Sequence, residues 1–207
     1  MLNNLKKKLK PNQKILAVSK LQPIDKIQKL HAEGQIDFGE NYVQEALDKI
    51  EQLKALKLHW HLIGPIQSNK IKYLKNHFEY IHSVDSLKTA QMISAQAEKL
   101  NYLQKIFLQV NISSESSKSG FSIEEFQKNW AEISELKGVK VVGLMTMPPL
   151  QNESSQNQPI FKALKQLADQ YQLSELSMGT SHDYETALQE GSTWIRLGTV
   201  LFGERTK

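Results

Sequence analysis

The sequence contains no cysteine among its 207 residues. This absence excludes a disulfide framework and every metal site that is built on thiolates. The chain also lacks an apolar run long enough to cross a membrane, and its first residues lack the apolar core of a secretion signal. We therefore expect a cytoplasmic protein that does not bind a membrane.

The composition shows no excess of one charge that would indicate a nucleic-acid partner. Hydrophobic residues make up 40% of the chain and charged residues 23%, which is typical of an ordinary globular protein. The net charge is +4, and the positive charge is mostly lysine spread along the sequence. One dense cluster, Lys6 to Lys8 with Lys10, is interpreted as a solvated helix face. No nucleic acid is expected as a partner.

Short apolar runs alternate with longer amphipathic stretches along the whole chain. The predicted strands are Ile15–Ser19, Asp37–Gly39, Trp60–Gly64, Tyr80–Val84, Ile106–Ile112, Val139–Met147, Leu176–Gly179 and Trp194–Phe202. Each but the last is followed by a stretch with helical spacing, and Ser122 with Glu125 predicts a capping box at the start of one helix. This alternation indicates parallel strands joined by right-handed crossovers.

The count of eight strand–helix units predicts a compact (β/α)8 TIM-type barrel that forms a single domain over residues 1–207. A doubly wound open sheet is the alternative fold, but its Gly-x-Gly-x-x-Gly signature is missing. The polar segment 148–159, which has prolines at both ends, is predicted to be an exposed loop after the sixth strand.

Two glycine-containing segments mark the expected functional face of the barrel. Active sites of such barrels lie at the carboxyl ends of the strands, and phosphate commonly binds after strands seven and eight. There the sequence has Met178–Ser181 and Arg196–Thr199, which offer glycine for close backbone approach and hydroxyls for hydrogen bonds. A helix expected to begin near Asp183 would add free N–H groups. Glycines that merely turn the chain are the alternative reading.

Lys20 follows the first apolar run and would stand at the mouth of the barrel. A desolvated amine there can attack a carbonyl and form a Schiff base. The alternative is a lysine that simply leaves the strand for solvent. In a closed barrel the first and eighth strands are neighbours, so Lys20 would lie beside the phosphate loops. A lysine beside a phosphate site is what pyridoxal 5'-phosphate (PLP) requires.

Two further residues fit that cofactor. Arg196 lies two residues before Gly198 and shares its face of the strand, from which it could meet the pyridine nitrogen and keep it unprotonated. Its alternative role is a salt bridge at the barrel rim. Asn41, after the second strand, could hydrogen-bond the ring hydroxyl, or it could be a helix N-cap.

The histidines offer little evidence for other chemistry. His59 and His61 alternate on the third strand and share a face, but no third metal ligand is suggested by spacing, so we expect packing and no metal. His82 and Asp85 end the fourth strand without an obvious serine or cysteine nucleophile to serve. The sequence therefore shows no catalytic triad.

Motifs over nearly the whole chain resemble those of the pyridoxal phosphate homeostasis protein family. They are Ala17–Lys20, Phe38–Glu45, Trp60–Lys70, Val110–Ser113, Ser117–Gly120, Gly143–Met147, Leu176–Ser181 and Ile195–Thr199. The resemblance implies a barrel like the amino-terminal domain of alanine racemase, with PLP held as a Schiff base on Lys20. It also implies a phosphate held by Ser181 and the Gly198–Thr199 backbone, and Arg196 at the ring nitrogen.

The same resemblance implies a function in vitamin B6 homeostasis without an established reaction, and PLP-dependent apo-enzymes as partners. Two positions depart from the family: Gln22 stands where a second lysine is common, and His182 where an acidic residue is common. Lys118 matches a family lysine in the segment 113–120, which suggests an accessory role in cofactor handling.

Three functions are weighed on this basis. The first is a non-catalytic PLP carrier or regulator, expected to be a monomer. The second is a PLP-dependent amino-acid racemase, which usually needs two bases on opposite faces of the cofactor, and the related racemase takes one from a domain for which this chain has no room. The third is a barrel enzyme that forms a Schiff base with another phosphorylated metabolite. The carrier is expected.

Overall fold

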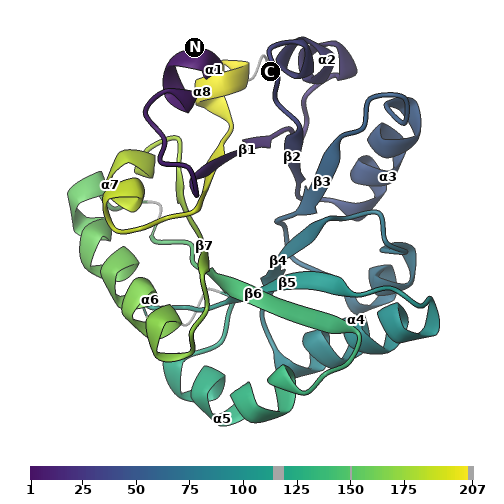
Figure 1. Cartoon of the computed structure of the whole chain (residues 1–207), viewed down its shortest axis with the longest axis vertical. Helices are drawn as coiled ribbons and strands as arrows, with labels where there is room; N and C mark the ends of the chain where they lie inside the picture. Colours follow the sequence, from purple (N-terminus) through teal and green to yellow (C-terminus); the bar gives the residue numbers. More distant parts are fainter. Residues whose placement is uncertain (114–118, 150, 205–207) are drawn as a thin grey trace.

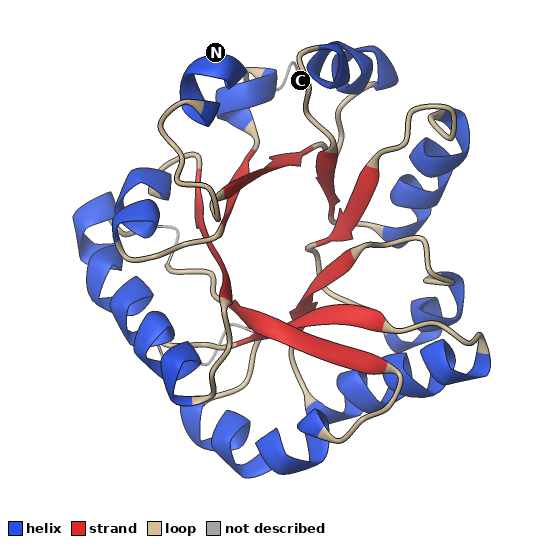
Figure 2. Cartoon of the chain, viewed as in Figure 1, coloured by secondary structure: helices blue, strands red, loops and turns tan. Residues whose placement is uncertain are grey.

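The computed structural model describes residues 1–113, 119–149 and 151–204, and these form a closed barrel of eight parallel strands in chain order (Figure 1). The strands are β1 (Lys14–Val18), β2 (Asp37–Glu40), β3 (His59–Leu62), β4 (Tyr80–Val84), β5 (Gln104–Gln109), β6 (Val139–Met145), β7 (Glu175–Thr180) and β8 (Trp194–Leu197). The helices surround this ring (Figure 2). They are α1 (Leu2–Lys6), α2 (Ile24–Ala32), α3 (Val43–Gln52), η1 (Ser68–Tyr73), α4 (Leu87–Lys99), α5 (Ile123–Ser134), η2 (Ser154–Asn157), α6 (Gln158–Gln170), α7 (Tyr184–Gln189) and α8 (Thr199–Phe202).

The predicted barrel is confirmed, and each predicted strand overlaps an observed one. The eighth strand was predicted too long. It ends at Leu197, because the backbone of Gly198 leaves the extended region with φ −106° and ψ −84°, and α8 follows at once. The last strand is therefore also followed by a helix.

Local sequence explains the regular alternation. All five residues of β4 are buried, as expected for a parallel strand with the barrel interior on one side and helices on the other. The predicted capping box at the start of α5 is present, with Ser122 and Glu125 bonded to each other's backbone. Phe126 and Ile133 on the same helix are buried against the barrel.

Pairing between the first and last strands closes the barrel. Lys14 of β1 is in register with Trp194 of β8, and Ala17 with Leu197. The carboxyl ends of these strands therefore lie side by side, and the chain that follows β1 meets the chain that follows β8.

The segment 148–159 differs from the predicted loop. It contains the short helix η2, and Asn157 at its end is buried, where its amide donates to Asp183 Oδ2 at 2.7 Å. A buried carboxylate thus gives this polar segment an anchor that composition does not reveal. Leu150 lies outside the described residues.

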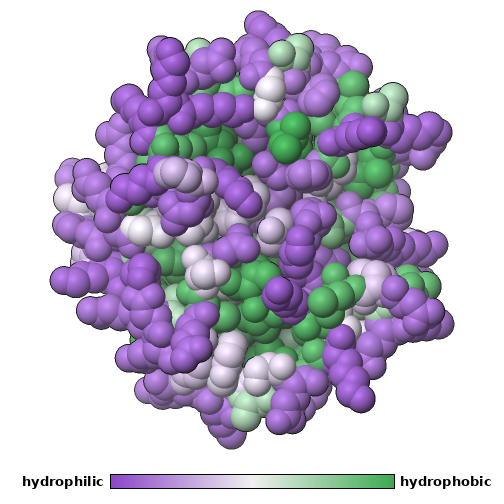
Figure 3. Space-filling view, viewed as in Figure 1, coloured by the Kyte–Doolittle hydropathy of each residue, from purple (hydrophilic) through white to green (hydrophobic). Residues whose placement is uncertain are grey.

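The face of the molecule seen in Figure 3 is mostly hydrophilic. On the face seen in Figure 3, hydrophilic side chains predominate at the rim, with hydrophobic side chains between them. Lys6, Lys7, Lys8 and Lys10 are exposed, which confirms the solvated cluster, although α1 itself ends at Lys6. Within the described ranges, no helix combines the length and the apolar character needed to cross a membrane.

Candidate functional site

A cavity of about 410 Å³ opens at the carboxyl ends of β1 and β8. Its size lies in the range of about 300–1,000 Å³ that small-molecule sites occupy. It is lined by Val18, Lys20, Asn41, Ile63, Met147, Thr180, Ser181, His182, Arg196, Gly198 and Thr199. The structure thus brings together all six predicted cofactor residues: Lys20, Asn41, Ser181, Arg196, Gly198 and Thr199.

Lys20 lies in a turn two residues beyond the end of β1 and is half-buried at the cavity. The next residue, Leu21, has φ +59°, a left-handed conformation that is uncommon for residues other than glycine. Its N–H donates to Glu45 Oε1 at 2.6 Å. The turn that carries the amine is therefore held from α3.

A buried ionic cluster supports this turn and was not anticipated from the sequence. Lys49 Nζ on α3 donates to Ser19 O at 2.7 Å, to Glu40 Oε1 at 2.8 Å and to Glu45 Oε1 at 2.7 Å. Glu40 is fully buried at the end of β2 and also accepts from Ser19 Oγ at 2.6 Å. Burial raises the pKa of Glu40, although Lys49 and Ser19 oppose that shift. Among the described residues its Oε2 has no hydrogen-bond partner.

The loops after β7 and β8 meet, as predicted. The N–H of Gly198 donates to Ser181 Oγ at 3.2 Å. Gly179 has φ +90°, and a Cβ there would lie 2.5 Å from Ala187 Cβ, so the position requires glycine. Asp183, directly before α7, accepts from the N–H of Thr180 at 2.6 Å and fixes the loop. A hydroxyl of one loop and a backbone N–H of the other therefore meet at one point of the cavity wall.

Arg196 is buried on β8, and its guanidinium is held by neutral groups. Its Nη1 donates to Ser177 O at 2.6 Å and to Ser177 Oγ at 2.7 Å, and its Nη2 donates to Thr146 O at 2.9 Å and to Met147 Sδ at 2.9 Å. In the described part of the chain no carboxylate lies within ion-pair distance, so the rim salt bridge is wrong. Burial lowers the pKa of Arg196 to about 10, which leaves it protonated at neutral pH.

Asn41 lies in the cavity wall and is not a helix cap. The N-cap position of α3 is Tyr42, and it has no side-chain cap bond, so that alternative for Asn41 is wrong. The backbone of Asn41 packs directly on Gly64, where an added Cβ would lie 2.2 Å from Asn41 O. This close approach fixes the backbone of Asn41 beside the cavity.

His82 has a serine beside it, contrary to the expectation from sequence. Its Nδ1 lies 2.7 Å from Ser177 Oγ, and its Nε2 lies 3.0 Å from His61 Nδ1. All three side chains are fully buried, so a substrate cannot reach Ser177 as a nucleophile. Reading strands one at a time missed this contact, although polar residues at inward positions of several strands are a usable signal.

The predicted packing of His61 is confirmed, whereas His59 is half-exposed. Both rings contact one oxygen of Asp37, His59 Nδ1 at 3.1 Å and His61 Nε2 at 3.3 Å. Burial opposes ionisation of Asp37, but the hydrogen bonds to the two histidines outweigh it and lower the pKa of this carboxyl. Within the described residues, no group of three or more histidine, aspartate or glutamate side chains could hold a metal ion.

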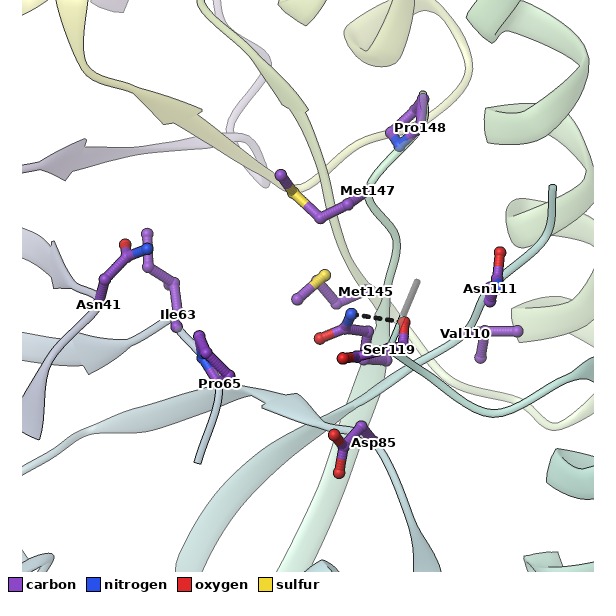
Figure 4. Close-up of a pocket in the computed structure, with 12 residues that line it drawn as sticks. Asn41, Ile63, Pro65, Asp85, Val110, Asn111, Ser119, Met145, Met147 and Pro148 are labelled. Atoms are coloured by element: carbon purple, nitrogen blue, oxygen red, sulfur yellow. Dashed lines mark hydrogen bonds between the residues drawn. The ribbon is translucent and has the colours of Figure 1, made fainter. Parts of the chain in front are cut away.

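A second cavity of about 350 Å³ continues from the first (Figure 4). The two share Asn41, Ile63 and Met147. The second extends to Asp85 and to Asn111. Figure 4 shows a dashed hydrogen bond at Ser119, whose backbone oxygen accepts from Gln109 Nε2 at 2.8 Å.

The structure places the two positions that depart from the family, Gln22 and His182, but not Lys118. Gln22 is buried near the lysine turn. His182 lines the main cavity, with Nε2 3.2 Å from Asn152 O. Lys118 lies outside the described residues, so its predicted role stays a prediction.

Comparisons with known proteins agree with this geometry. The chain matches the family described as alanine racemase, N-terminal domain, over residues 2–206. It is 44% identical over 193 residues to the pyridoxal phosphate homeostasis protein of Pseudomonas aeruginosa, covering 92% of this chain and 84% of that one. The Aquifex aeolicus protein of the same name is 42% identical over 198 residues, covering 93% of this chain and 87% of that one.

Solved structures show the same relation. PipY of Synechococcus elongatus with PLP bound has a TM-score of 0.92 and 38% identity, covering 98% of both chains. An alanine racemase of Clostridium difficile, at 18% identity and a TM-score of 0.75, shares the fold alone and is matched over 56% of its length. The chain therefore belongs to the alanine racemase N-terminal domain family and, within it, to the pyridoxal phosphate homeostasis proteins.

Proposed function

We propose that this protein binds PLP in the main cavity, holds it as a Schiff base on Lys20, and acts in intracellular vitamin B6 homeostasis without catalysing a reaction. The observation that carries the proposal is that one cavity is lined by the Lys20 amine, by loops that carry the hydroxyls of Ser181 and Thr199, and by the buried Arg196 guanidinium. Relatives named pyridoxal phosphate homeostasis protein and the PLP-bound PipY structure support it.

The residues present fit such a ligand. Ser181 and Thr199 would hold the phosphate, and the N–H of Gly198 would join them by exchanging its bond to Ser181 Oγ for one to the phosphate. Asn41 would bond the ring hydroxyl. The backbone of Gly198 is open to a ligand, because within the described residues a Cβ added there would meet nothing closer than Val18 Cβ at 3.8 Å. When bound, PLP would supply an aldehyde for the Lys20 amine, and their condensation to a C=N bond would release one water.

Arg196 would face the pyridine nitrogen. Its Nη1 and Nη2 donate to residues of β7 and of the chain at the end of β6, and no acceptor among the described residues takes its Nε–H. That N–H is therefore the donor left for a ligand in the cavity. A donor aimed at the ring nitrogen disfavours its protonation, and an unprotonated pyridine is a poor electron sink.

This arrangement supports a carrier rather than a racemase. Racemisation usually needs a second base on the other face of the ring, and Tyr42, the nearest phenol by sequence, is 55% exposed and does not line the cavity. The fold likeness to alanine racemase favours the racemase alternative, but at 18% identity it concerns architecture. Delivery to PLP-dependent apo-enzymes is part of the proposal, whereas the monomeric state and cytoplasmic location stay predictions from the sequence.

The test is reduction of the PLP-loaded protein with borohydride followed by peptide mass analysis. We expect visible absorption that reduction removes, and a pyridoxyl mass on the peptide containing Lys20. Lys20→Ala should lose the covalent adduct, whereas Lys118→Ala should keep it. A Lys20→Ala protein with a reducible adduct at full occupancy would falsify the assignment.

Catalysis is tested separately by deuterium exchange at Cα of L- and D-alanine in heavy water. Exchange needs only proton abstraction, so it would reveal even half of a racemase mechanism. We expect none at rates typical of enzymes. Exchange at about 1 per second or faster would contradict the carrier proposal and support the racemase.

A further inference from the structure

A continuous row of polar side chains crosses the barrel interior from the cofactor cavity to the opposite end. Arg196 Nη1 lies 2.7 Å from Ser177 Oγ, which lies 2.7 Å from His82 Nδ1. His82 Nε2 lies 3.0 Å from His61 Nδ1, and His61 Nε2 lies 3.3 Å from Asp37 Oδ1. Asp37 is the first residue of β2, so the row ends at the amino-terminal end of the strands.

Outside the row, Asp37 Oδ1 also contacts His59 Nδ1, and Arg196 also donates to Ser177 O, Thr146 O and Met147 Sδ. The two histidine rings inside the barrel are surrounded by aromatic side chains. The ring of His61 packs on Tyr80, with centroids 5.0 Å apart, and on Trp194 at 4.9 Å. The ring of His82 stacks on Phe107 at 4.3 Å. Such barrels usually fill their interior with branched apolar side chains, and buried polar groups are costly unless they are hydrogen-bonded. The row is therefore a complete polar network inside an aromatic wall.

Donor and acceptor chemistry fixes the direction of every bond. A carboxylate only accepts and a guanidinium only donates. Burial lowers the pKa of His61, and that of His82 well below its ordinary value, so each neutral ring carries one N–H. His61 must use its Nε2–H for Asp37, so its Nδ1 accepts the Nε2–H of His82.

The rest of the row follows. Because the Nδ1 of His82 carries no proton, it must accept the hydroxyl hydrogen of Ser177. The lone pairs of Ser177 Oγ are then left for Arg196. The carboxylate end sets this assignment, because a hydroxyl that accepts from Arg196 can still either donate to or accept from a neighbouring ring. Every bond then runs from the guanidinium toward the carboxylate.

We propose that Arg196, Ser177, His82, His61 and Asp37 form a one-way hydrogen-bond relay by which Asp37 orients Arg196 from the far end of the barrel. Each bond in such a chain polarises the next, so the carboxylate keeps the Ser177 lone pairs turned toward the guanidinium. Asp37, His61, His82 and Ser177 are positioning residues, since none of them lines the cavity. The consequence for PLP rests on the proposed function, in which Arg196 meets the ring nitrogen.

The first test needs no cofactor. Nitrogen-15 NMR of the histidine rings in the ligand-free protein reports which ring nitrogen of each histidine carries hydrogen. We expect His61 and His82 both in the Nε2–H form at neutral pH. Finding His82 in the Nδ1–H form would overturn the relay without any variant.

The second test separates the hydrogen bond from the charge. Asp37→Asn keeps an acceptor and should preserve both tautomers, whereas Asp37→Leu removes the acceptor and should give mixed tautomers at His61 and His82. Glu79→Gln is the matched control, because it removes a carboxylate that precedes β4 and pairs with Lys105 outside the row. Unchanged tautomers in Asp37→Leu would overturn the relay, as would equal changes in Asp37→Leu and Glu79→Gln.

The last test measures PLP affinity and the absorption of the bound cofactor in the same proteins. Asp37→Leu should weaken binding by up to about tenfold, the size of one ordinary hydrogen bond, and should alter the spectrum. Asp37→Asn and Glu79→Gln should stay close to the parent. Correct tautomers in a protein that binds no PLP would refute the proposed function while supporting the relay, and tight PLP binding unaffected by Asp37→Leu would refute the relay's effect on the site.

Discussion

The two cationic side chains of the cavity are held in opposite ways. The turn of Lys20 is supported by ions, because Lys49 bridges the carboxylates of Glu40 and Glu45 beneath it. The guanidinium of Arg196 is held by carbonyls, a thioether and a hydroxyl, and the nearest anion in its row is four hydrogen bonds away. The lysine side of the site, meaning the Lys20 turn with its supporting residues, is thus fixed by charge. The arginine side, meaning Arg196 and the row of polar residues behind it, is fixed by neutral dipoles.

The difference matters because the two supports fail differently. A buried ion pair is strongly destabilising when one partner is lost, since the other charge stays buried without compensation. A neutral network loses only the affected hydrogen bonds, and its groups respond to pH through the histidines. We therefore expect the free energy of unfolding to be most sensitive to mutation on the lysine side and to acid on the arginine side.

The largest expected effect is that of Lys49→Met on the lysine side. Removing the ammonium leaves Glu40 buried and without its cation, so the free energy of unfolding should fall by about 3–5 kcal/mol. Urea denaturation measures the loss. The double variant Lys49→Met/Glu40→Gln should recover much of it, because the uncompensated charge is gone. If the double variant is no more stable than the single one, the ionic account of this side is wrong.

The next-largest expected effect is the loss of stability in acid, which should come from the histidines on the arginine side. The folded-state pKa values of His61 and His82 are lowered, so below about pH 6.5 the unfolded chain binds protons that the folded protein does not. Stability should be unaffected by these groups above that pH and should fall as the pH drops, by up to about 1.4 kcal/mol per pH unit for each histidine. Urea denaturation from pH 7 to pH 5 checks the slope.

The control for the acid experiment is His82→Asn, which keeps a polar side chain but removes one titrating ring. Between pH 7 and pH 5, the free energy of unfolding of this variant should change with pH less steeply than that of the parent, by up to about half. A parent protein whose stability is flat between pH 7 and pH 5 would mean that the buried histidines do not titrate as the structure implies.

The parts of the site that follow from strand order were accessible to sequence reasoning. Lys20 and Ser181 each follow a strand of the eight-unit rhythm, and closing the barrel brings them together whatever the side-chain details. The contact between His82 and Ser177 joins residues 95 positions apart on strands that are not neighbours. It depends on which side chains meet inside the barrel, which periodicity alone does not specify.

The Lys49 cluster could not be predicted from the sequence for a related reason. Glu45 and Lys49 at helical i,i+4 spacing predict an ordinary surface pair. Only the packing of α3 against the end of β2 turns the pair toward Glu40 and buries the ammonium. The exposed cluster at Lys6 to Lys8 looks more prominent in the sequence, yet it supports nothing at the cavity.

Ser177→Ala should have an intermediate effect on the arginine side. It removes the hydroxyl that donates to His82 and accepts from Arg196, while the bond from Arg196 Nη1 to Ser177 O remains. Leaving the buried Nδ1 of His82 unsatisfied should cost about 1–3 kcal/mol in the free energy of unfolding. Ser192→Ala, a buried serine on the same side of the barrel that bonds only backbone carbonyls, is the control and should not change the tautomer of His82.

The smallest expected effect tests how firmly charge holds the lysine turn. Leu21→Gly should relieve the left-handed strain at φ +59° but make the unfolded chain more flexible, so stability should change by less than about 1 kcal/mol. Because Leu21 is 62% exposed, little packing is lost. If the bond from its N–H to Glu45 fixes the turn, PLP attachment to Lys20 should be kept in Leu21→Gly and slowed in Glu45→Met, which removes the acceptor. Borohydride trapping over time measures both rates, and equal slowing in the two variants would show that the leucine itself, rather than the carboxylate, shapes the turn.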